Sequence, residues 1–572
     1  MLTTRPTSLR HVAIAVAVCF ILFAGSSVER AMALPTCATL ANSLTGQPPI
    51  KSAASSIVGP SGPNAGYCLV KLLYGEDATQ NINILVALPL SAADGGSGGG
   101  VTGAWNGRTQ GVGGGGCSGV STVNSAMTAA INAGYVASGT DLGHVGGDCE
   151  PGVNPDGTYN FRFIEDFIRV AIKQQVLYSK SIASTYYGMS ATYNYWNGCS
   201  TGGRQGYLLA QELGEELDGI LANAPAIYWT RFQTAQMWGQ IAMKDLVGGP
   251  ISLAKLGQVQ TSAVQACDAA DGVADGIIDD PRTCAFDARS NICGSPGVPA
   301  ATCLTPAEAD AVNKIWDGPR NRKNNRIWFG LDRGTAFNIL NGPTPFALGV
   351  IQFHWNEHDR DFDWQEVSLA EYPAVARDGS RNIADVTDTF GHLDRFMAHG
   401  GKLLTFVGAN DQFIYPRGVI NYYREMAARY SRRPGRPDFA NLQKFYRLFR
   451  APGVGHCGGG AGPTPVDAFS ALVNWVERNQ PPETLLAAGG SAAPPTGRTR
   501  PLCPYPLTAI YDGTGDINSA SSFHCGGNLE ARQVVCKDVL TRYKHEVQGE
   551  LDFSGTGLQP ADCRAYLSER RR

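Results

Sequence analysis

The sequence predicts an α/β fold, in which a mostly parallel sheet carries helices on its faces. Strand-like runs alternate with helical runs along much of the chain. Glycine supplies 69 of the 572 residues, nearly double the usual share of about 7%, which favours many tight turns over a helical bundle. The hydrophobic content of 43% is that of a globular protein, so the composition argues against disorder and against a multi-span membrane protein.

The predicted elements follow one another in the order that such a fold requires. Apolar residues recur at helical spacing over 161–179, and helical patterning resumes at 207–213. No later stretch of the sequence is typical of a transmembrane segment, and no internal repeat is evident. The strand-like runs are 82–90, 133–139, 192–196, 403–407 and 446–449.

The first 33 residues have the pattern of a secretory signal peptide. Arg5, Arg10 and His11 form a basic start, residues 12–24 are apolar, and residues 31–33 are a small-x-small cleavage signal. The apolar run is too short to cross a bilayer comfortably, and the alternative is an uncleaved membrane anchor. We therefore expect a secreted or periplasmic protein with no membrane attachment after the signal is removed.

Cysteine usage and charge point to an exported protein that does not bind nucleic acid. The chain has 15 Cys, and loss of residues 1–33 would discard Cys19 and leave an even number. Because the export route is oxidising, disulfides are the default state of these residues. The formal net charge of −3 removes the main electrostatic reason to expect a nucleic-acid partner.

The chain divides into a split core and two other segments. Residues 229–395 hold four Cys, an acidic loop and an aromatic-rich region, and we interpret them as a lid domain inserted between two core parts, 34–228 and 396–481. The last segment, 482–572, begins with a stretch rich in Ala, Gly, Pro and Thr that is typical of a flexible linker. This linker, up to residue 500, precedes a C-terminal piece with four more Cys.

The strongest chemical motif is Gly198-Cys199-Ser200-Thr201-Gly202, a G-x-S-x-G pattern between a strand-like and a helical run. A sharp turn at this point would lift the serine hydroxyl above the sheet, and the flanking glycines avoid clashes. The Thr201 N–H would then lie at a helix N-terminus, where a developing oxyanion is stabilised. Ser200 is thus the expected nucleophile, and the alternative is a glycine-rich loop with an incidental serine.

A serine nucleophile needs a base, and in this arrangement an acid and then a histidine follow it along the chain. His456 follows a strand-like run and lies in a glycine-rich loop, where a catalytic imidazole is expected. Asp411 follows the preceding strand-like run and would fix the His456 tautomer, although simple turn chemistry is an alternative. The other histidines after Ser200 are interpreted as structural or surface residues at 354, 358, 392 and 399, and as part of the Cys-rich C-terminal piece at 524.

Two cysteines adjoin the predicted catalytic residues. Cys199 precedes Ser200, and Cys457 follows His456. If the serine and the histidine are neighbours in space, the two thiols are neighbours as well, and a disulfide would join the two loops. The alternative is a cysteine nucleophile at 199, against which the predicted export and the even Cys count argue.

The combination of residues 198–206 (GCSTGGRQG), the Asp411 turn and Gly455-His456-Cys457 resembles the tannase/feruloyl esterase family. That family includes tannases, feruloyl esterases and mono(2-hydroxyethyl) terephthalate hydrolase, and the resemblance covers most of the mature chain. It implies an α/β-hydrolase core with a large lid, a Ser200–Asp411–His456 triad and a Cys199–Cys457 disulfide. Further blocks that resemble the family are 105–108 with 113–116, 140–144 and 498–506.

The resemblance further implies an ester hydrolase that forms an acyl-enzyme. Ser200 would attack the ester carbonyl, with His456 as base and then as acid. The Thr201 N–H and a glycine N–H, from Gly115 or Gly116, would hold the oxyanion. The chain departs from its relatives at this loop, because it has Gly114-Gly115-Gly116-Cys117 where they carry an Asn-Gly-Gly-aromatic pattern.

The resemblance also implies a structural Ca²⁺ ion in the lid. Residues 268–279 concentrate carboxylates and glycines, and Ca²⁺ binds about six to eight oxygens, some of them backbone carbonyls. From the residues alone, a solvated acidic turn is an equally good explanation. The ligands that the resemblance implies are the side chains of Asp268, Asp271 and Asp275 and the backbone oxygens of Val273 and Ile277.

The remaining cysteines predict further disulfides. Cys267 and Cys284 flank the acidic loop and are expected to pair. Such bridges would make the fold resistant to unfolding. The other expected pairs are Cys293–Cys303, Cys37–Cys68 and Cys503–Cys525, and Cys117–Cys149 and Cys536–Cys563 follow by elimination.

Substrate choice is expected to depend on the lid. Terephthalate half-ester hydrolases pair a lid arginine with the free carboxylate, and this chain has residues 341–346 (NGPTPF) where such an arginine would fall. We therefore expect the substrate to be a small aromatic ester of gallate or hydroxycinnamate type, with the terephthalate half-ester as the second candidate substrate. A remote alternative for the whole protein is a non-catalytic calcium-dependent binding protein. Six lid aromatics could stack on a phenolic acyl group or form lid core instead: Trp328, Phe329, Phe353, Trp355, Phe362 and Trp364.

Overall fold

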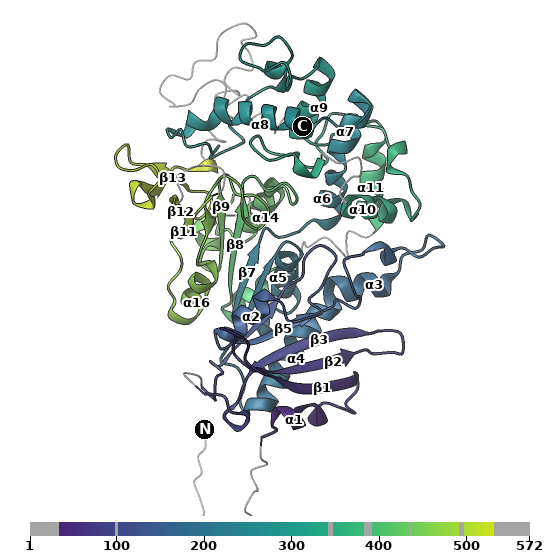
Figure 1. Ribbon diagram of the computed structural model, residues 1–572, viewed down its shortest axis with the longest axis vertical. Coiled ribbons are helices and arrows are strands. Elements are labelled where there is room, and N and C mark those ends of the chain that lie inside the picture. The colour runs from purple at the N-terminus through teal and green to yellow at the C-terminus, as the bar shows by residue number, and fades with distance from the viewer. Residues whose placement is uncertain are drawn as a thin grey trace, which may run out of the picture. The chain divides into compact units, whose positions relative to one another are not determined.

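The computed structural model describes residues 34–97, 101–340, 347–382, 392–433, 436–490 and 497–530 (Figure 1). The predicted signal peptide, residues 341–346 and the Cys536–Cys563 pair therefore lie outside the described residues. Within the described ranges, no helix has the length and apolar character that a membrane crossing requires.

In the described part of the chain, the main sheet has nine strands in the order β1-β2-β3-β5-β4-β6-β7-β8-β9. Neighbours from β1 through β3 and on to β5 are antiparallel, whereas all the other pairs are parallel. This mixed, largely parallel sheet with helices confirms the predicted α/β-hydrolase core. The strands are β1 (Ile50–Val58), β2 (Tyr67–Tyr74), β3 (Ile82–Pro89), β4 (Arg108–Val112), β5 (Val136–Thr140), β6 (Tyr193–Cys199), β7 (Gly219–Asn223), β8 (Lys402–Gly408) and β9 (Tyr446–Ala451).

Helices bury both faces of this sheet, because side chains alternate between the faces along each strand. On β3, Leu85 and Ala87 belong to the core beneath α2 (Ser125–Asn132) and α16 (Ala468–Arg478). Ile84 and Val86 belong to the core of the opposite face. The helices of that opposite face are α4 (Ala171–Tyr187), α5 (Thr201–Glu212) and α14 (Pro416–Arg429).

The expected strands near 82, 192, 403 and 446 are confirmed within a few residues, and the strand expected at 133–139 begins later, at Val136. The helix expected over 161–179 is one helical stretch in three parts: α3 (Phe161–Glu165), the π-helical turn η4 (Asp166–Val170) and α4. The sequence did not predict β4, because its residues RTQGV include a single large apolar side chain and show no alternation.

The prediction of a flexible linker over residues 482–500 is wrong for part of this stretch. Residues Leu485–Ala488 form β11, which pairs with β10 (Thr464–Pro465) and β12 (Thr499–Leu502) in a second sheet. Leu485 and Ala487 are buried in the core beneath α16. Burial of these two side chains orders a stretch whose composition alone is typical of a linker.

The segment predicted as the lid is helical. Between β7 and β8, its described residues contain helices and no strand of any sheet. Figure 1 shows α6 to α11 gathered together, apart from the helices that cover the sheet. They are α6 (Trp229–Gln236), α7 (Trp238–Val247), α8 (Leu253–Cys267), α9 (Pro306–Asp317), α10 (Ala347–Glu357) and α11 (Tyr372–Asn382), with α13 (Asp394–His399) leading into β8.

The π-helical turn begins at a buried acid. Asp166 is 4% exposed, and its Oδ1 accepts a hydrogen bond from Gln80 Nε2 at 2.5 Å. Burial raises the pKa of the Asp166 carboxyl from 3.8 to about 6. The folded state therefore holds this proton more tightly than the unfolded chain does.

This raised pKa gives a pH dependence of stability with a definite sign. The stabilisation is complete below about pH 4 and is lost as the pH rises through about 6, since ionising the buried carboxyl then opposes folding. We expect Asp166→Asn, which keeps an oxygen for Gln80 but cannot ionise, to raise the free energy of unfolding at about pH 8 by up to about 3 kcal/mol. Urea unfolding of both proteins at several pH values measures this.

Asp77→Asn is the control for that experiment. Hydrogen bonds from Thr79 and Gln80 lower the pKa of the exposed Asp77 carboxyl to about 2. Removing this carboxylate should therefore not raise the free energy of unfolding at high pH. Equal pH profiles for the wild type and Asp166→Asn would contradict the prediction.

Candidate active site

Ser200 lies in the sharp turn between β6 and α5, with φ 62° and ψ −123°. A non-glycine residue adopts such a backbone only where its surroundings enforce it. Its N–H donates to Asn223 O at 3.0 Å, which ties the turn to the end of β7. A Cβ at Gly198 would lie 2.4 Å from Gly202 O, so the turn requires glycine there. The serine is therefore held on the strained turn expected of a nucleophile.

His456 and Asp411 follow the last two strands of the main sheet and meet beyond their ends. His456 Nδ1 lies 2.8 Å from Asp411 Oδ2. The Asp411 side chain is fully buried, and its Oδ1 accepts the backbone N–H groups of Phe413 at 2.9 Å and Ile414 at 3.0 Å. Asp411 can thus orient the ring and leave Nε2 for proton transfer.

A disulfide joins the serine turn to the histidine loop. Cys199 and Cys457 are bonded, with Cα atoms 6.0 Å apart, across 258 residues of sequence. The bond brings the neighbour of Ser200 beside the neighbour of His456. Because its sulfur is in a disulfide, Cys199 has no thiolate to act as the alternative nucleophile.

Ser200 and His456 line one cavity of about 390 Å³. Thr201 and Gly116 also border it, and two glutamines of α6 contribute the other polar side chains. A cavity of this volume can hold a small aromatic acyl group. The apolar wall consists of Ala226, Trp229, Phe232, Leu348, Phe413 and Ile414.

None of the six aromatic residues predicted for substrate contact is among the described residues that line this cavity. Phe353 and Trp355 are at most 1% exposed, and Trp328 is 5% exposed. Phe353 packs against Phe362 and Tyr372 of the helical segment, as the lid-core alternative expects. Trp355 instead packs against the first core part, where its Nε1 donates to Cys149 O at 3.1 Å. Trp229 and Phe232, at the start of the helical segment, and Phe413 line the cavity instead. Sequence reasoning missed them because nothing in the local pattern separates them from core residues.

The glycine loop after β4 lies against the start of α5. Gly202 N–H donates to Gly114 O at 2.9 Å, and Thr201 Oγ1 donates to Gly116 O at 2.7 Å. Gly115 N–H is committed to Ser118 O at 3.0 Å. The N–H groups of Gly116 and Thr201 have no acceptor among the described residues, so this pair has the free donors that an oxyanion hole needs.

A second cavity, of about 470 Å³, also borders His456. Its wall mixes amide and apolar side chains with backbone from four glycines of the histidine loop, and no Asp, Glu, Lys or Arg is among the described residues that line it. The histidine therefore lies between the cavity that contains the serine and a second one that is richer in amide groups. The amide side chains of this second cavity are Gln260, Gln265, Asn338, Asn410 and Gln412.

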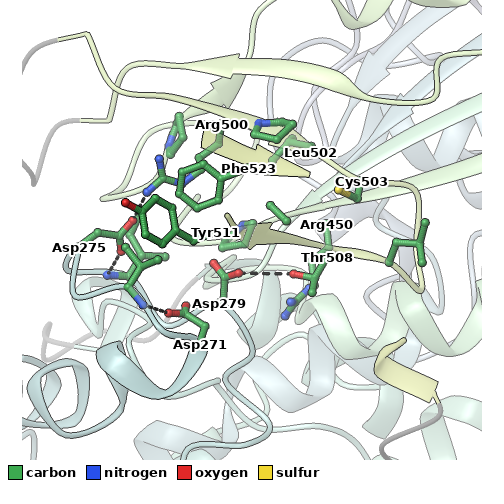
Figure 2. Close-up of a pocket in the computed structure, with 17 residues that line it drawn as sticks. Asp271, Asp275, Asp279, Arg450, Arg500, Leu502, Cys503, Thr508, Tyr511 and Phe523 are labelled. Atoms are coloured by element: carbon green, nitrogen blue, oxygen red, sulfur yellow. Dashed lines mark hydrogen bonds and ion pairs between the residues drawn. The ribbon is translucent and has the colours of Figure 1, made fainter. Parts of the chain in front are cut away.

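Most of the predicted calcium ligands face a separate pocket (Figure 2). Asp271, Val273, Asp275 and Ile277 line it together with Asp279, which was not among the predicted ligands. Figure 2 shows Asp271, Asp275 and Asp279 around the pocket, with Arg450 and Arg500 among its other lining residues.

Asp268 has a different position. Its carboxylate accepts the backbone N–H groups of Asp275, Gly276 and Ile277 at 2.9 to 3.2 Å. It is not among the described residues that line the pocket. Asp268 thus holds the backbone of the acidic loop in its conformation.

The pocket offers oxygen ligands, which are the kind that a hard cation such as Ca²⁺ prefers. The backbone oxygens of Val273 and Ile277 accept no hydrogen bond from the described residues, and burial raises the pKa of the Asp279 carboxyl to about 6. Asp275, however, is already paired with Arg500 and with Arg498. No group of three or more His, Cys, Asp or Glu side chains in the described ranges has the arrangement of a metal site.

The other predicted cysteine pairs within the described residues are bonded. None of these cysteines is among the described residues that line the Ser200 cavity. Cys117 follows Gly116 directly, so its bond to Cys149 anchors the end of the glycine loop. The pairs are Cys37–Cys68, Cys117–Cys149, Cys267–Cys284, Cys293–Cys303 and Cys503–Cys525.

Known proteins resemble this chain over most of its length. A probable feruloyl esterase of Arthroderma benhamiae is 34% identical over 446 residues, which cover 74% of this chain and 80% of the relative. A mono(2-hydroxyethyl) terephthalate hydrolase of Piscinibacter sakaiensis is 28% identical, with 74% and 79% covered.

Solved structures share the fold. Feruloyl esterase B from Aspergillus oryzae superposes with a TM-score of 0.73 at 22% identity, covering 86% of this chain and 99% of that protein. A tannin acyl hydrolase from Aspergillus niger gives 0.73 at 23%, with 87% and 99% covered. The model of the family described as tannase and feruloyl esterase matches residues 101–526. The chain therefore belongs to the tannase and feruloyl esterase family and is a carboxylic ester hydrolase.

Proposed function

We propose that the protein is an exported serine esterase that hydrolyses small aromatic esters of gallate or hydroxycinnamate type. The observation that carries this proposal is the 2.8 Å contact between His456 Nδ1 and Asp411 Oδ2 beside the Cys199–Cys457 disulfide. Together they set an imidazole and a serine on the wall of one largely apolar cavity. Relatives named feruloyl esterase and tannin acyl hydrolase support the phenolic substrate class.

In the proposed reaction, Ser200 Oγ attacks the ester carbonyl while His456 Nε2 takes the hydroxyl proton. The N–H groups of Gly116 and Thr201 stabilise the oxyanion of the tetrahedral intermediate. Its collapse expels the alcohol, which receives the proton from His456. Water, deprotonated by the same imidazole, then attacks the acyl-enzyme and releases the acid and the free serine.

Two alternatives have less support. The resemblance to a mono(2-hydroxyethyl) terephthalate hydrolase keeps the terephthalate half-ester as runner-up, but no Lys or Arg is among the described residues that line the Ser200 cavity. A non-catalytic binding protein would lack one of the triad residues, and all three are present.

Export rests on two features. The leader-like pattern at residues 1–33 predicts secretion or a periplasmic location. Six disulfides join described residues, and such bonds persist in oxidising compartments.

We also propose that the acidic loop binds a structural Ca²⁺ ion. Asp271, Asp275 and the backbone oxygens of Val273 and Ile277 would hold it, as the family resemblance implies, and Asp279 adds a carboxylate on the same pocket. Asp268, the fifth residue that the resemblance implies, would instead support the loop through its backbone contacts. The ion would neutralise clustered carboxylates and take no part in the ester chemistry.

The nucleophile assignment is tested with Ser200→Ala. We expect kcat/KM on methyl gallate and methyl ferulate to fall by at least about 10⁴-fold, since the other triad residues cannot substitute for the nucleophile. Ser190→Ala, at an exposed serine, is the control and should match the wild type. Undiminished turnover by a folded Ser200→Ala variant would refute the assignment.

The disulfide prediction compares two double variants. Cys199→Ala with Cys457→Ala should lower kcat/KM by about 10²-fold, because a shift of about 1 Å between serine and histidine costs that much. Cys293→Ala with Cys303→Ala removes a disulfide of the helical segment and should leave kcat/KM near that of the wild type. Full activity of the first pair would show that the bond does not position the site.

The metal prediction is tested by thermal unfolding. After dialysis against a chelator, adding Ca²⁺ should raise Tm, since a ligand that binds only the folded state at about 100 times its Kd adds about 2.7 kcal/mol. Asp271→Asn should abolish the shift, and Asp361→Asn, at an exposed acid outside the loop, should retain it. A wild-type Tm that does not change when Ca²⁺ is added would contradict the proposal.

A further inference from the structure

The cavity that contains Ser200 has two unusual polar groups on its wall. Gln233 and Gln236 both come from α6 and are three residues apart, so they share a face of the helix. They are 1% and 2% exposed, and the Oε1 atom of each is buried without a hydrogen-bond partner. Among the described residues that line this cavity, these two alone have such atoms.

The orientation of the Gln236 amide follows from its other contact. Gln236 Nε2 donates to the backbone oxygen of Phe413 at 2.9 Å. A carbonyl oxygen can only accept, so the nitrogen must face Phe413 and the unpaired atom must be the oxygen. Gln236, a residue that lines the cavity, therefore has a buried hydrogen-bond acceptor of fixed orientation.

Leaving a buried acceptor unpaired is costly, and most buried polar groups in folded proteins have partners. Two unpaired acceptors on one helix face, both in residues that line the same cavity, are explained if a bound ligand reaches them and supplies the donors. Amide oxygens complement hydroxyl groups and repel carboxylates. The aromatic residues around them, Trp229, Phe232 and Phe413, can pack against a ring.

We propose that Gln233 and Gln236 determine substrate specificity by accepting hydrogen bonds from hydroxyl groups on the aromatic ring of the acyl part. The inference rests on the proposed function, because it takes this cavity as the acyl site of a serine esterase. A site built to bind a hydroxyl rejects the analogue without it far more strongly than an apolar pocket rejects a change in size. The two glutamines would thus select phenolic acids over unsubstituted aromatic acids and over acids with a second carboxylate.

The test compares pairs of esters that differ only at the positions of the ring hydroxyl groups. The pairs are methyl 4-hydroxycinnamate with methyl 4-methylcinnamate, and methyl gallate with methyl benzoate. We expect the wild type to prefer the hydroxylated member of at least one pair by about 100-fold in kcat/KM. Gln233→Met and Gln236→Met should each lower that preference about tenfold, through slower turnover of the hydroxylated ester and not of its partner.

Gln240→Met is the matched control. Gln240 is a buried glutamine of α7 and is not among the described residues that line the cavity. Its replacement should leave the preference unchanged. An equal loss of kcat/KM on both esters of a pair would assign Gln233 and Gln236 a structural role and overturn the inference.

The outcomes separate the inference from the proposed function. A wild type that hydrolyses these esters without preferring the hydroxyl, or that prefers the terephthalate half-ester, overturns the inference and leaves the serine esterase intact. Failure to hydrolyse any of the esters overturns both. A wild type without the preference overturns the inference even where a variant does not fold.

Discussion

The candidate site depends on the close approach of three backbone segments at the ends of β4, β6 and β9. The Cys199–Cys457 bond joins the second and third of these covalently. Loop 113–116 approaches the second so closely that a Cβ at Gly113 would lie 2.4 Å from Gly202 Cα. Because backbone meets backbone there, the N–H donors and the serine are set by main-chain geometry. The imidazole is held by the buried Asp411 carboxylate and by the disulfide next to it.

Support for this arrangement extends from the core into the first helix of the inserted segment. The Arg204 guanidinium lies 5.2 Å from the ring centre of Phe167 and 5.4 Å from that of Trp229. Arg204 is 1% exposed, and burial lowers its pKa to about 9. A cation is costly to bury and is stabilised here by aromatic faces. Arg204 thus fixes Trp229, an aromatic wall of the cavity, from behind.

The sequence predicted what depends on local pattern and short motifs. Long apolar strands such as 82–90 and the glycine-flanked Ser200 have local signatures, and Cys199 and Cys457 mark the approach of distant loops. The strand Arg108–Val112 has no such signature, since its burial is imposed by its neighbours β5 and β6. Propensity is a weak guide where tertiary contacts decide.

The same reasoning explains why the aromatic residues of the cavity were not predicted. Among apolar side chains, a residue that lines a cavity and one that fills a core have the same local pattern, so Trp229 could not be told from Trp355. Polar residues are more informative. A buried polar atom without a hydrogen-bond partner destabilises a protein core, whereas in a binding site it can pair with a ligand. Gln233 and Gln236 have no distinctive sequence signature, but their unpaired oxygens distinguish them once the fold is known. In the proposed acyl site, the apolar wall packs against the aromatic ring, and the buried acceptors of Gln233 and Gln236 discriminate between hydroxylated and unsubstituted rings.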